Sequence, residues 1–168
     1  DVFVSVAKEL VAEVNVQNAN GDVEEQKKQI DYFIKKGMDV IVIISIDAEE
    51  LKESVEKAKK EGIRVIAYDR QINDSDVDLY ISFDNEEVGT MMALALVSHG
   101  ISGGNVLMLG GSPTDGNVAM VEKGFREVMK RNQVTILDTM HADGWKAELA
   151  AEYVYSHGDM VRLADGIM

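Results

Sequence analysis

Hydrophobic and polar residues alternate with two periodicities along this chain, one typical of helices and one typical of strands. In residues 1–11, apolar positions recur every three or four residues, which predicts a helix with one buried stripe. Residues 12–16 alternate between apolar and polar and predict a short strand. A polar turn follows, and residues 23–36 then predict a second helix that ends at Gly37.

Continuous β-branched runs come next and are typical of parallel strands that helices cover on both faces. Such runs occupy residues 40–45 and 64–68, and Asp47 is placed to cap a helix over residues 48–61 between them. A third strand is expected at residues 79–83. This alternation of strand and helix predicts an α/β fold with a doubly wound parallel sheet.

A second round of the same alternation begins after residue 83. It predicts helices at residues 86–99, 118–131 and 147–155, and strands at residues 105–109 and 134–139. The tail, residues 158–168, carries an apolar face and is expected to be helical. We therefore expect two lobes, residues 1–83 and residues 84–168, with a boundary near Asp84.

Charge and composition narrow the possible partners. The net charge is -13, so the surface repels phosphate backbones, and we expect no nucleic acid partner. The chain has no cysteine, which excludes disulfides and thiol nucleophiles. No apolar run in it is long enough to cross a membrane, and because residues 1–4 lack a basic region followed by an apolar stretch, we expect no signal peptide among these residues. Its three histidines lack metal-site spacing, and we expect no cofactor and no metal.

Candidate binding chemistry lies at the carboxyl ends of the predicted strands, where loops of an open parallel sheet converge. Asp69 and Arg70 end one strand and offer carboxylate acceptors beside a planar fork of donors. Sugar hydroxyls need both kinds of partner. An ion pair at the strand end, or an aspartate that accepts turn amides, is the structural alternative.

A glycine-rich loop, residues 110–117, lies between a predicted strand and a predicted helix. It lacks the Lys-Ser or Lys-Thr of a phosphate-binding loop, and Asp115 would place negative charge where a phosphate has to bind. Asp115 and Asn117 suit neutral hydroxyl groups better, although either residue could be a helix cap.

Trp145 is the only tryptophan and follows Asp143 and Gly144 at the end of a strand. Aromatic faces stack well on the C–H-rich faces of sugar rings, so Trp145 is a candidate stacking residue. An ordinary core tryptophan is the alternative.

Several motifs together resemble a known family. They are Val16 to Gly21, Ala67 to Arg70, Asp76 to Asn85, Gly110 to Asp115 and Asp143 to Trp145. In order and spacing they are similar to bacterial D-xylose-binding proteins, which belong to the type I periplasmic sugar-binding proteins. The resemblance runs from Asp1 to about Trp145.

This resemblance implies two α/β lobes that close over D-xylose or a similar aldopentose. It implies delivery to a membrane ABC permease, or signalling to a chemoreceptor or sensor histidine kinase, at a periplasmic or extracellular membrane surface. By resemblance, Asp69 and Arg70 would bind sugar hydroxyls from the first lobe. Asp115 and Asn117 would bind them from the second lobe, and Trp145 would stack on the sugar ring.

The chain also departs from the family pattern. The family's opening strand should precede Asp1, and most of the second lobe should follow Tyr155. We therefore expect a partial chain, with another chain or an omitted segment completing the first sheet. The alternative function is the effector-binding core of a lac-repressor-type regulator. No acid or base with an activating neighbour is evident, so we expect no enzyme activity.

Overall fold

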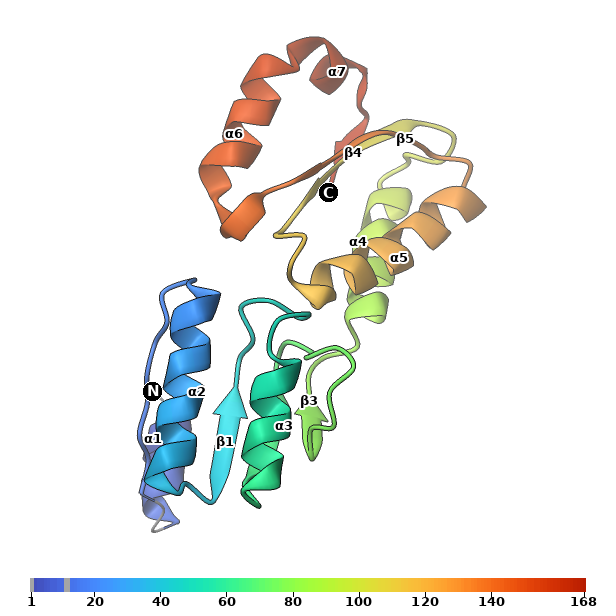
Figure 1. Cartoon of the computed structure of the whole chain (residues 1–168). Coiled ribbons are helices and arrows are strands. Elements are labelled where there is room, and N and C mark those ends of the chain that lie inside the picture. The colour runs from blue at the N-terminus through green and yellow to red at the C-terminus, as the bar shows by residue number, and fades with distance from the viewer. Residues whose placement is uncertain (1, 11–12) are drawn as a thin grey trace.

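The structure is a computed structural model, and it describes residues 2–10 and 13–168 (Figure 1). Its helices are α1 (Val2–Glu9), α2 (Val23–Lys36), α3 (Lys52–Lys60), α4 (Asn85–Ser98), α5 (Gly116–Arg131), α6 (Ala147–Ser156) and α7 (Gly158–Leu163), with a 3-10 turn η1 (Asp143–Trp145). Its strands are β1 (Val40–Ile43), β2 (Arg64–Tyr68), β3 (Leu79–Ile81), β4 (Asn105–Gly110), β5 (Thr135–His141) and β6 (Gly166–Ile167).

The first sheet has the strand order β1-β2-β3, and all its pairs are parallel. Helices α2 and α3 cover one face, where Ile41 and Ile43 of β1 pack into a core with Leu51 and Val55. The alternate residues of β1 point to the other face and are exposed. Coverage of this strand on both faces was therefore predicted wrongly, because Val40 and Val42 on the second face stay exposed.

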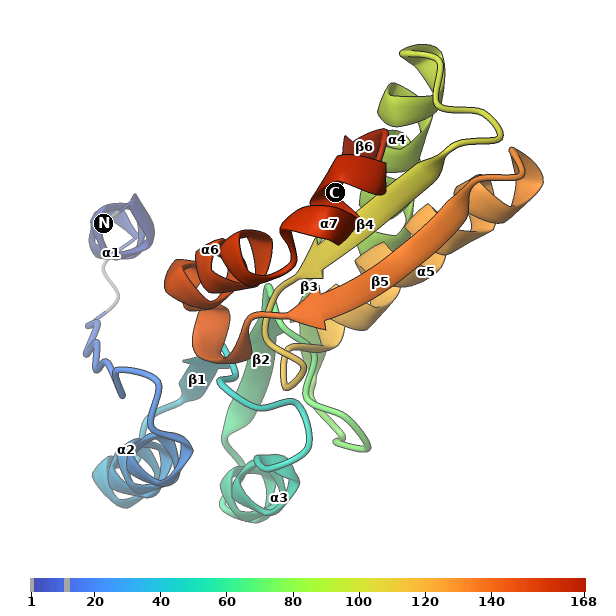
Figure 2. The same cartoon turned by 90° about the horizontal axis from the view of Figure 1, so that it is seen from above.

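The second sheet has the order β5-β4-β6 and is also parallel. Figure 2 shows α4 and α5 on one face and α6 and α7 on the other. The central strand β4 is accordingly buried on both faces, with Val106, Leu107 and Met108 fully enclosed. Phe125 and Met129 of α5 pack against it. The predicted α/β class with parallel sheets is confirmed.

The predictions for the N-terminal segment were partly wrong. Helix α1 forms within the predicted residues 1–11, of which 1 and 11 lie outside the described residues, but its apolar stripe is not buried. Residue 12 also lies outside the described residues, and residues 13–16 form no strand. Strand β1 pairs with β2 alone in the described chain, so residues 13–16 have no adjacent strand to complete their hydrogen bonds.

The helix predicted over residues 48–61 begins four residues late. The backbone N–H of Ala48 donates to the Thr114 carbonyl at 3.1 Å, and the Ala48 carbonyl accepts from the Asn73 N–H at 2.7 Å. These long-range bonds hold Ala48 in an extended connection. Asp47 therefore caps only a local turn, by accepting the backbone N–H two residues later at 2.9 Å.

The tail also differs from its prediction, because the helix over residues 158–168 ends at Leu163. Gly166–Ile167 then forms β6, which pairs with Val106 and Leu107 on the open edge of β4. The remaining predicted helices and strands agree with the structure within two residues at each end. The lobe boundary near Asp84 stays a prediction. Within the described ranges, every helix is too short or too polar to span a bilayer.

Helices α4 and α5 cross in backbone contact through a pair of glycines. A Cβ at Gly124 would lie 1.9 Å from the carbonyl oxygen of Glu86, and a Cβ at Gly89 would lie 1.8 Å from that of Val121. Real Cβ atoms do not approach backbone so closely, so each helix has a glycine where the other helix crosses it.

We expect Gly124→Ala to destabilise the protein by about 1–3 kcal/mol or more, because the added methyl group forces α4 and α5 apart. Gly158→Ala is the matched control, since its Cβ would meet only the flexible end of Arg162, at 3.5 Å. Thermal unfolding of both variants checks this prediction. Equal melting temperatures would show that the helix crossing tolerates a side chain.

Candidate functional site

The buried carboxylate of Asp115 is the centre of a polar cluster between the two sheets. Asp115 caps the N-terminus of α5, where its Oδ1 accepts the backbone N–H of Asn117 at 3.0 Å. Its Oδ2 accepts from Arg70 Nε at 2.9 Å and from Trp145 Nε1 at 3.2 Å. Only 3% of the Asp115 side chain is exposed, so these three donors compensate a desolvated charge.

Arg70 reaches this carboxylate from the first sheet, just beyond the end of β2. Its Nη1 donates to the Ser45 carbonyl at 3.3 Å, which anchors the guanidinium to the end of β1. The strand-end ion pair considered as an alternative does exist, but its partner is Asp115 of the second sheet and not the neighbouring Asp69. The pair thus joins the two halves of the chain.

Asp69 contributes its backbone to the cluster. It has a left-handed backbone with φ of 65°, and its carbonyl accepts from Ser82 Oγ at 2.7 Å and from Asn117 Nδ2 at 3.2 Å. Among the described residues, no hydrogen bond or ion pair uses its carboxylate. This carboxylate is half-buried and keeps its acceptor positions free for a ligand.

Asn117 carries a buried acceptor with no partner. While its Nδ2 donates to the Asp69 carbonyl, its Oδ1 is buried and makes no hydrogen bond within residues 2–10 and 13–168. An unpaired buried carbonyl oxygen is costly, and native proteins rarely keep one without a function. A ligand hydroxyl that donates to this oxygen would remove the cost.

Trp145 is held at the edge of the cluster by the turn η1. Gly144 and Trp145 both have left-handed backbones, with φ of 61° and 59°, and the Gly144 N–H donates to Ser112 Oγ at 3.2 Å. Trp145 remains 53% exposed, so the alternative of a core tryptophan does not hold. The structure therefore brings together all five residues singled out from the sequence.

The other polar residues at strand ends serve local turns and caps. Asn18 accepts the backbone N–H of Asn20 at 2.9 Å, and Asp84 caps α4 by accepting from Glu87 at 3.0 Å. Ser112, which supports η1, was not singled out individually. Its place in the glycine-rich loop was the only sequence signal for it.

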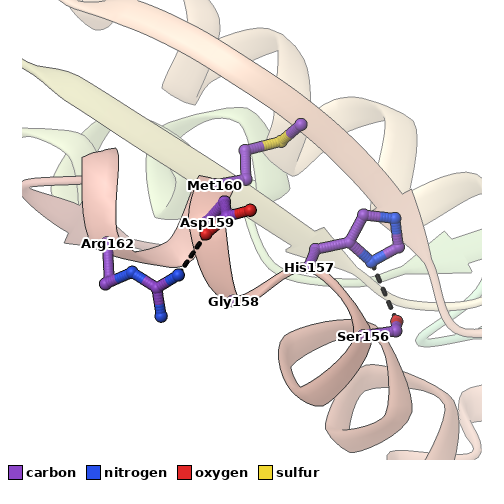
Figure 3. A pocket seen from close by; sticks show the side chains of 6 residues that line it. All are labelled: Ser156, His157, Gly158, Asp159, Met160 and Arg162. Carbon is purple, nitrogen blue, oxygen red and sulfur yellow. Dashed lines mark hydrogen bonds and ion pairs between the residues drawn. The ribbon is translucent and has the colours of Figure 1, made fainter.

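A separate hollow of about 390 Å³ opens where α6 meets α7 (Figure 3). Ser156, His157, Gly158, Asp159, Met160 and Arg162 line it. Figure 3 shows the side chain of Arg162 paired with Asp159, and that of His157 beside Ser156, with which it shares a hydrogen bond. These polar groups largely pair with one another, and none of the five predicted site residues lies here.

The cluster around Asp115 offers donors and acceptors but no catalytic pair. Three N–H groups of Arg70 remain unused after its bonds to Asp115 and Ser45, and the acceptors of Asp69 and Asn117 are free. The described part of the chain holds no group of three His, Cys, Asp or Glu side chains able to bind a metal ion. The arrangement suits a neutral ligand rich in hydroxyl groups.

A polar cluster beyond the carboxyl ends of parallel strands is where open α/β sheets bind their ligands. The comparison with family models identifies the family: the chain belongs to the periplasmic binding protein domain family, whose model matches residues 1–156. The resemblance to D-xylose-binding proteins is confirmed by curated relatives. The D-xylose-binding periplasmic protein of Escherichia coli K12 is 45% identical over 154 residues, covering 89% of this chain and 46% of that protein.

Other relatives point the same way. The D-xylose-binding periplasmic protein of Haemophilus influenzae is 42% identical over 90% of this chain and 47% of its own length. A solved solute-binding protein from Clostridium phytofermentans with bound β-D-glucose has a TM-score of 0.83 and 30% identity, over 91% of this chain and 53% of that one. The chain thus spans about half the length of the relatives it matches.

Helix α6, which follows Trp145, is tied to the second sheet by a phenol and a carboxylate. Tyr153 donates from its hydroxyl to Asp138 Oδ2 of β5 at 2.7 Å. Burial and this bond raise the pKa of Tyr153 to about 12. The bond from Tyr153 and the backbone N–H of Thr139 lower the pKa of Asp138.

We expect Asp138→Asn to lower the pKa of Tyr153 while leaving it above its ordinary value, because the burial of the ring remains. Ultraviolet titration of the phenolate measures this, with Tyr153→Phe identifying the signal. A lowered carboxyl pKa stabilises the fold above the unfolded-state pKa, and this stability is lost as pH falls through the folded-state pKa. The wild type should therefore lose more thermal stability on acidification than Asp138→Asn, and parallel losses would contradict the assignment.

Proposed function

We propose that this chain is part of a protein that binds D-xylose or a closely related aldopentose between two lobes, residues 1–83 and residues 84–168. One observation carries the proposal: Asp69, Arg70, Asp115, Asn117 and Trp145 converge from separate strand ends on one site. That site joins free donors, free acceptors and an exposed aromatic face, which together match a sugar.

Charge balance supports a neutral ligand. The guanidinium of Arg70 is already paired with the carboxylate of Asp115, so little net positive charge is left to attract a phosphate or carboxylate ligand. The buried Oδ1 of Asn117 needs a donor, which a sugar hydroxyl has and a carboxylate lacks. Sugar hydroxyls could also donate to the Asp69 carboxylate and accept from Arg70.

The choice of an aldopentose rests on the relatives. The relatives at 45% and 42% identity described above are named for D-xylose. A multiple sugar-binding receptor of Rhizobium radiobacter is 38% identical over 69% of this chain, so related aldoses remain within the proposal. The same residues would serve any of these sugars, because hydroxyl groups and a stacking face are common to all of them.

The proposed role is sugar uptake or sensing, without turnover. The partner would be a membrane ABC permease or a sensor histidine kinase, at the periplasmic or outer face of the membrane. Proteins similar to this chain are of both kinds. One kind is the periplasmic sugar-binding proteins described above. The other is the fructose-binding periplasmic domain of a hybrid two-component system, which has a TM-score of 0.87 and 25% identity over 93% of this chain and 52% of that one. Binding needs only hydrogen bonds and stacking, so no catalytic group is required.

We expect Arg70→Ala to weaken xylose binding by about 2 to 4 kcal/mol, because it removes charged donors and leaves the Asp115 carboxylate buried without them. Arg70→Lys should recover little, since one ammonium group cannot reproduce the planar fork. Isothermal calorimetry on the intact protein measures both. Wild-type affinity in the alanine variant would remove Arg70 from the site.

We expect Trp145→Ala to weaken xylose binding by about 1 to 3 kcal/mol through lost stacking area. Because Trp145 is 53% exposed, little packing is lost, and the melting temperature should fall only by the loss of the Nε1 bond to Asp115. Titrations and thermal melts of the same variant separate binding from packing. A large fall in melting temperature with unchanged affinity would make Trp145 a packing residue. In the wild type, xylose should shift the tryptophan emission as the indole leaves water.

A further inference from the structure

Gly111 lies directly against the indole of Trp145. A Cβ built on Gly111 would stand 2.3, 2.4 and 2.5 Å from Cη2, Cζ2 and Cζ3, three neighbouring atoms of the six-membered ring. An edge-on approach would bring the middle atom, Cη2, clearly nearer than the other two. The nearly equal distances therefore place the buried backbone of Gly111 against the face of the ring.

The hydrogen bonds of the indole and of its turn set the orientation of the ring, but not its distance from the loop that follows β4. The bond from Trp145 Nε1 to Asp115 holds one edge of the ring, and the bond from the Gly144 N–H to Ser112 holds the turn that carries it. Neither bond limits how far the ring sinks toward the loop that follows β4. That limit is set by Gly111, which packs on one ring face while Trp145 stays 53% exposed.

We propose that Gly111 is a positioning residue: by having no side chain, it sets the depth of the Trp145 indole and so the width of the space in which a sugar ring stacks. The proposal rests on the proposed function, because the sugar has to stack on the exposed face of the indole. An alanine at this position would push the ring outward, into the volume that the sugar occupies, and would stretch the bond from Nε1 to Asp115.

The test compares Gly111→Ala with Gly116→Ala in the intact protein. Gly116 lies in the same loop region, and its Cβ would make only an ordinary contact with the Ala48 side chain, at 3.9 Å. We expect Gly111→Ala to raise the Kd for xylose about tenfold or more, measured by calorimetry, and Gly116→Ala to leave it nearly unchanged. An unchanged Kd in Gly111→Ala would overturn the proposal.

A double-variant cycle shows whether Gly111 acts through the indole. In a Trp145→Ala background there is no ring to displace, so Gly111→Ala should change neither the Kd nor the melting temperature appreciably. An equal loss of affinity in that background would mean that alanine distorts the loop itself, and the proposal would fall. If Gly111→Ala alone does not fold, the melting temperatures of Trp145→Ala and of the double variant still test the proposal. A lower melting temperature in the double variant than in Trp145→Ala would mean that the alanine clashes with something other than the ring.

Emission of the sugar-free protein separates this inference from the proposed function. Trp145 is the only tryptophan of the 168 residues, and a displaced indole should emit at a different wavelength in Gly111→Ala but not in Gly116→Ala. That shift, together with a wild-type protein that binds no sugar, would support the ring contact and overturn the proposed function. Absence of the shift would overturn the positioning role even if xylose binds.

Discussion

The buried carboxylate of Asp115 is the constraint on which the polar cluster depends. A charge with 3% exposure is tolerated only with several donors close by, and Asp115 receives them from three separate elements. They are the first turn of α5, the end of β2 through Arg70, and η1 through Trp145. The three bonds together compensate one buried charge, and the bond from Arg70 links the first sheet to the second.

Much of the fold could be predicted from local pattern. Strand β4 is a continuous apolar run whose middle residues are fully buried, and the strand-end rule located Asp69, Arg70 and Trp145. The exposed stripe of α1 and the missing strand at residues 13–16 show the limit. An apolar pattern indicates that one side of an element can be buried, but burial also needs another element that packs against that side.

Details of the site could not be predicted from the sequence, because they too depend on which distant parts of the chain meet. Arg70 follows Asp69 directly, yet its ion pair is with Asp115. Asp69 lies beyond the end of β2 with a left-handed backbone, and the loop after β4 brings the Asp115 carboxylate to 2.9 Å from Arg70 Nε. The sequence argued against a phosphate site in the glycine-rich loop, but it did not predict the contact between Gly111 and the indole. In the structure Gly111 provides flat backbone for an indole, and Asp115 provides a cap and an ion pair.

The glycine crossing of α4 and α5 has a mechanical consequence. Helices in backbone contact at Gly89 and Gly124 cannot slide or rotate independently, so α4 and α5 move as one rigid unit. This unit begins at Asp84, where the chain enters α4 from the first sheet. It also carries Asp115, which caps the start of α5. Any displacement of α4 at Asp84 therefore has to carry α5, and with it the Asp115 cap, by the same rotation.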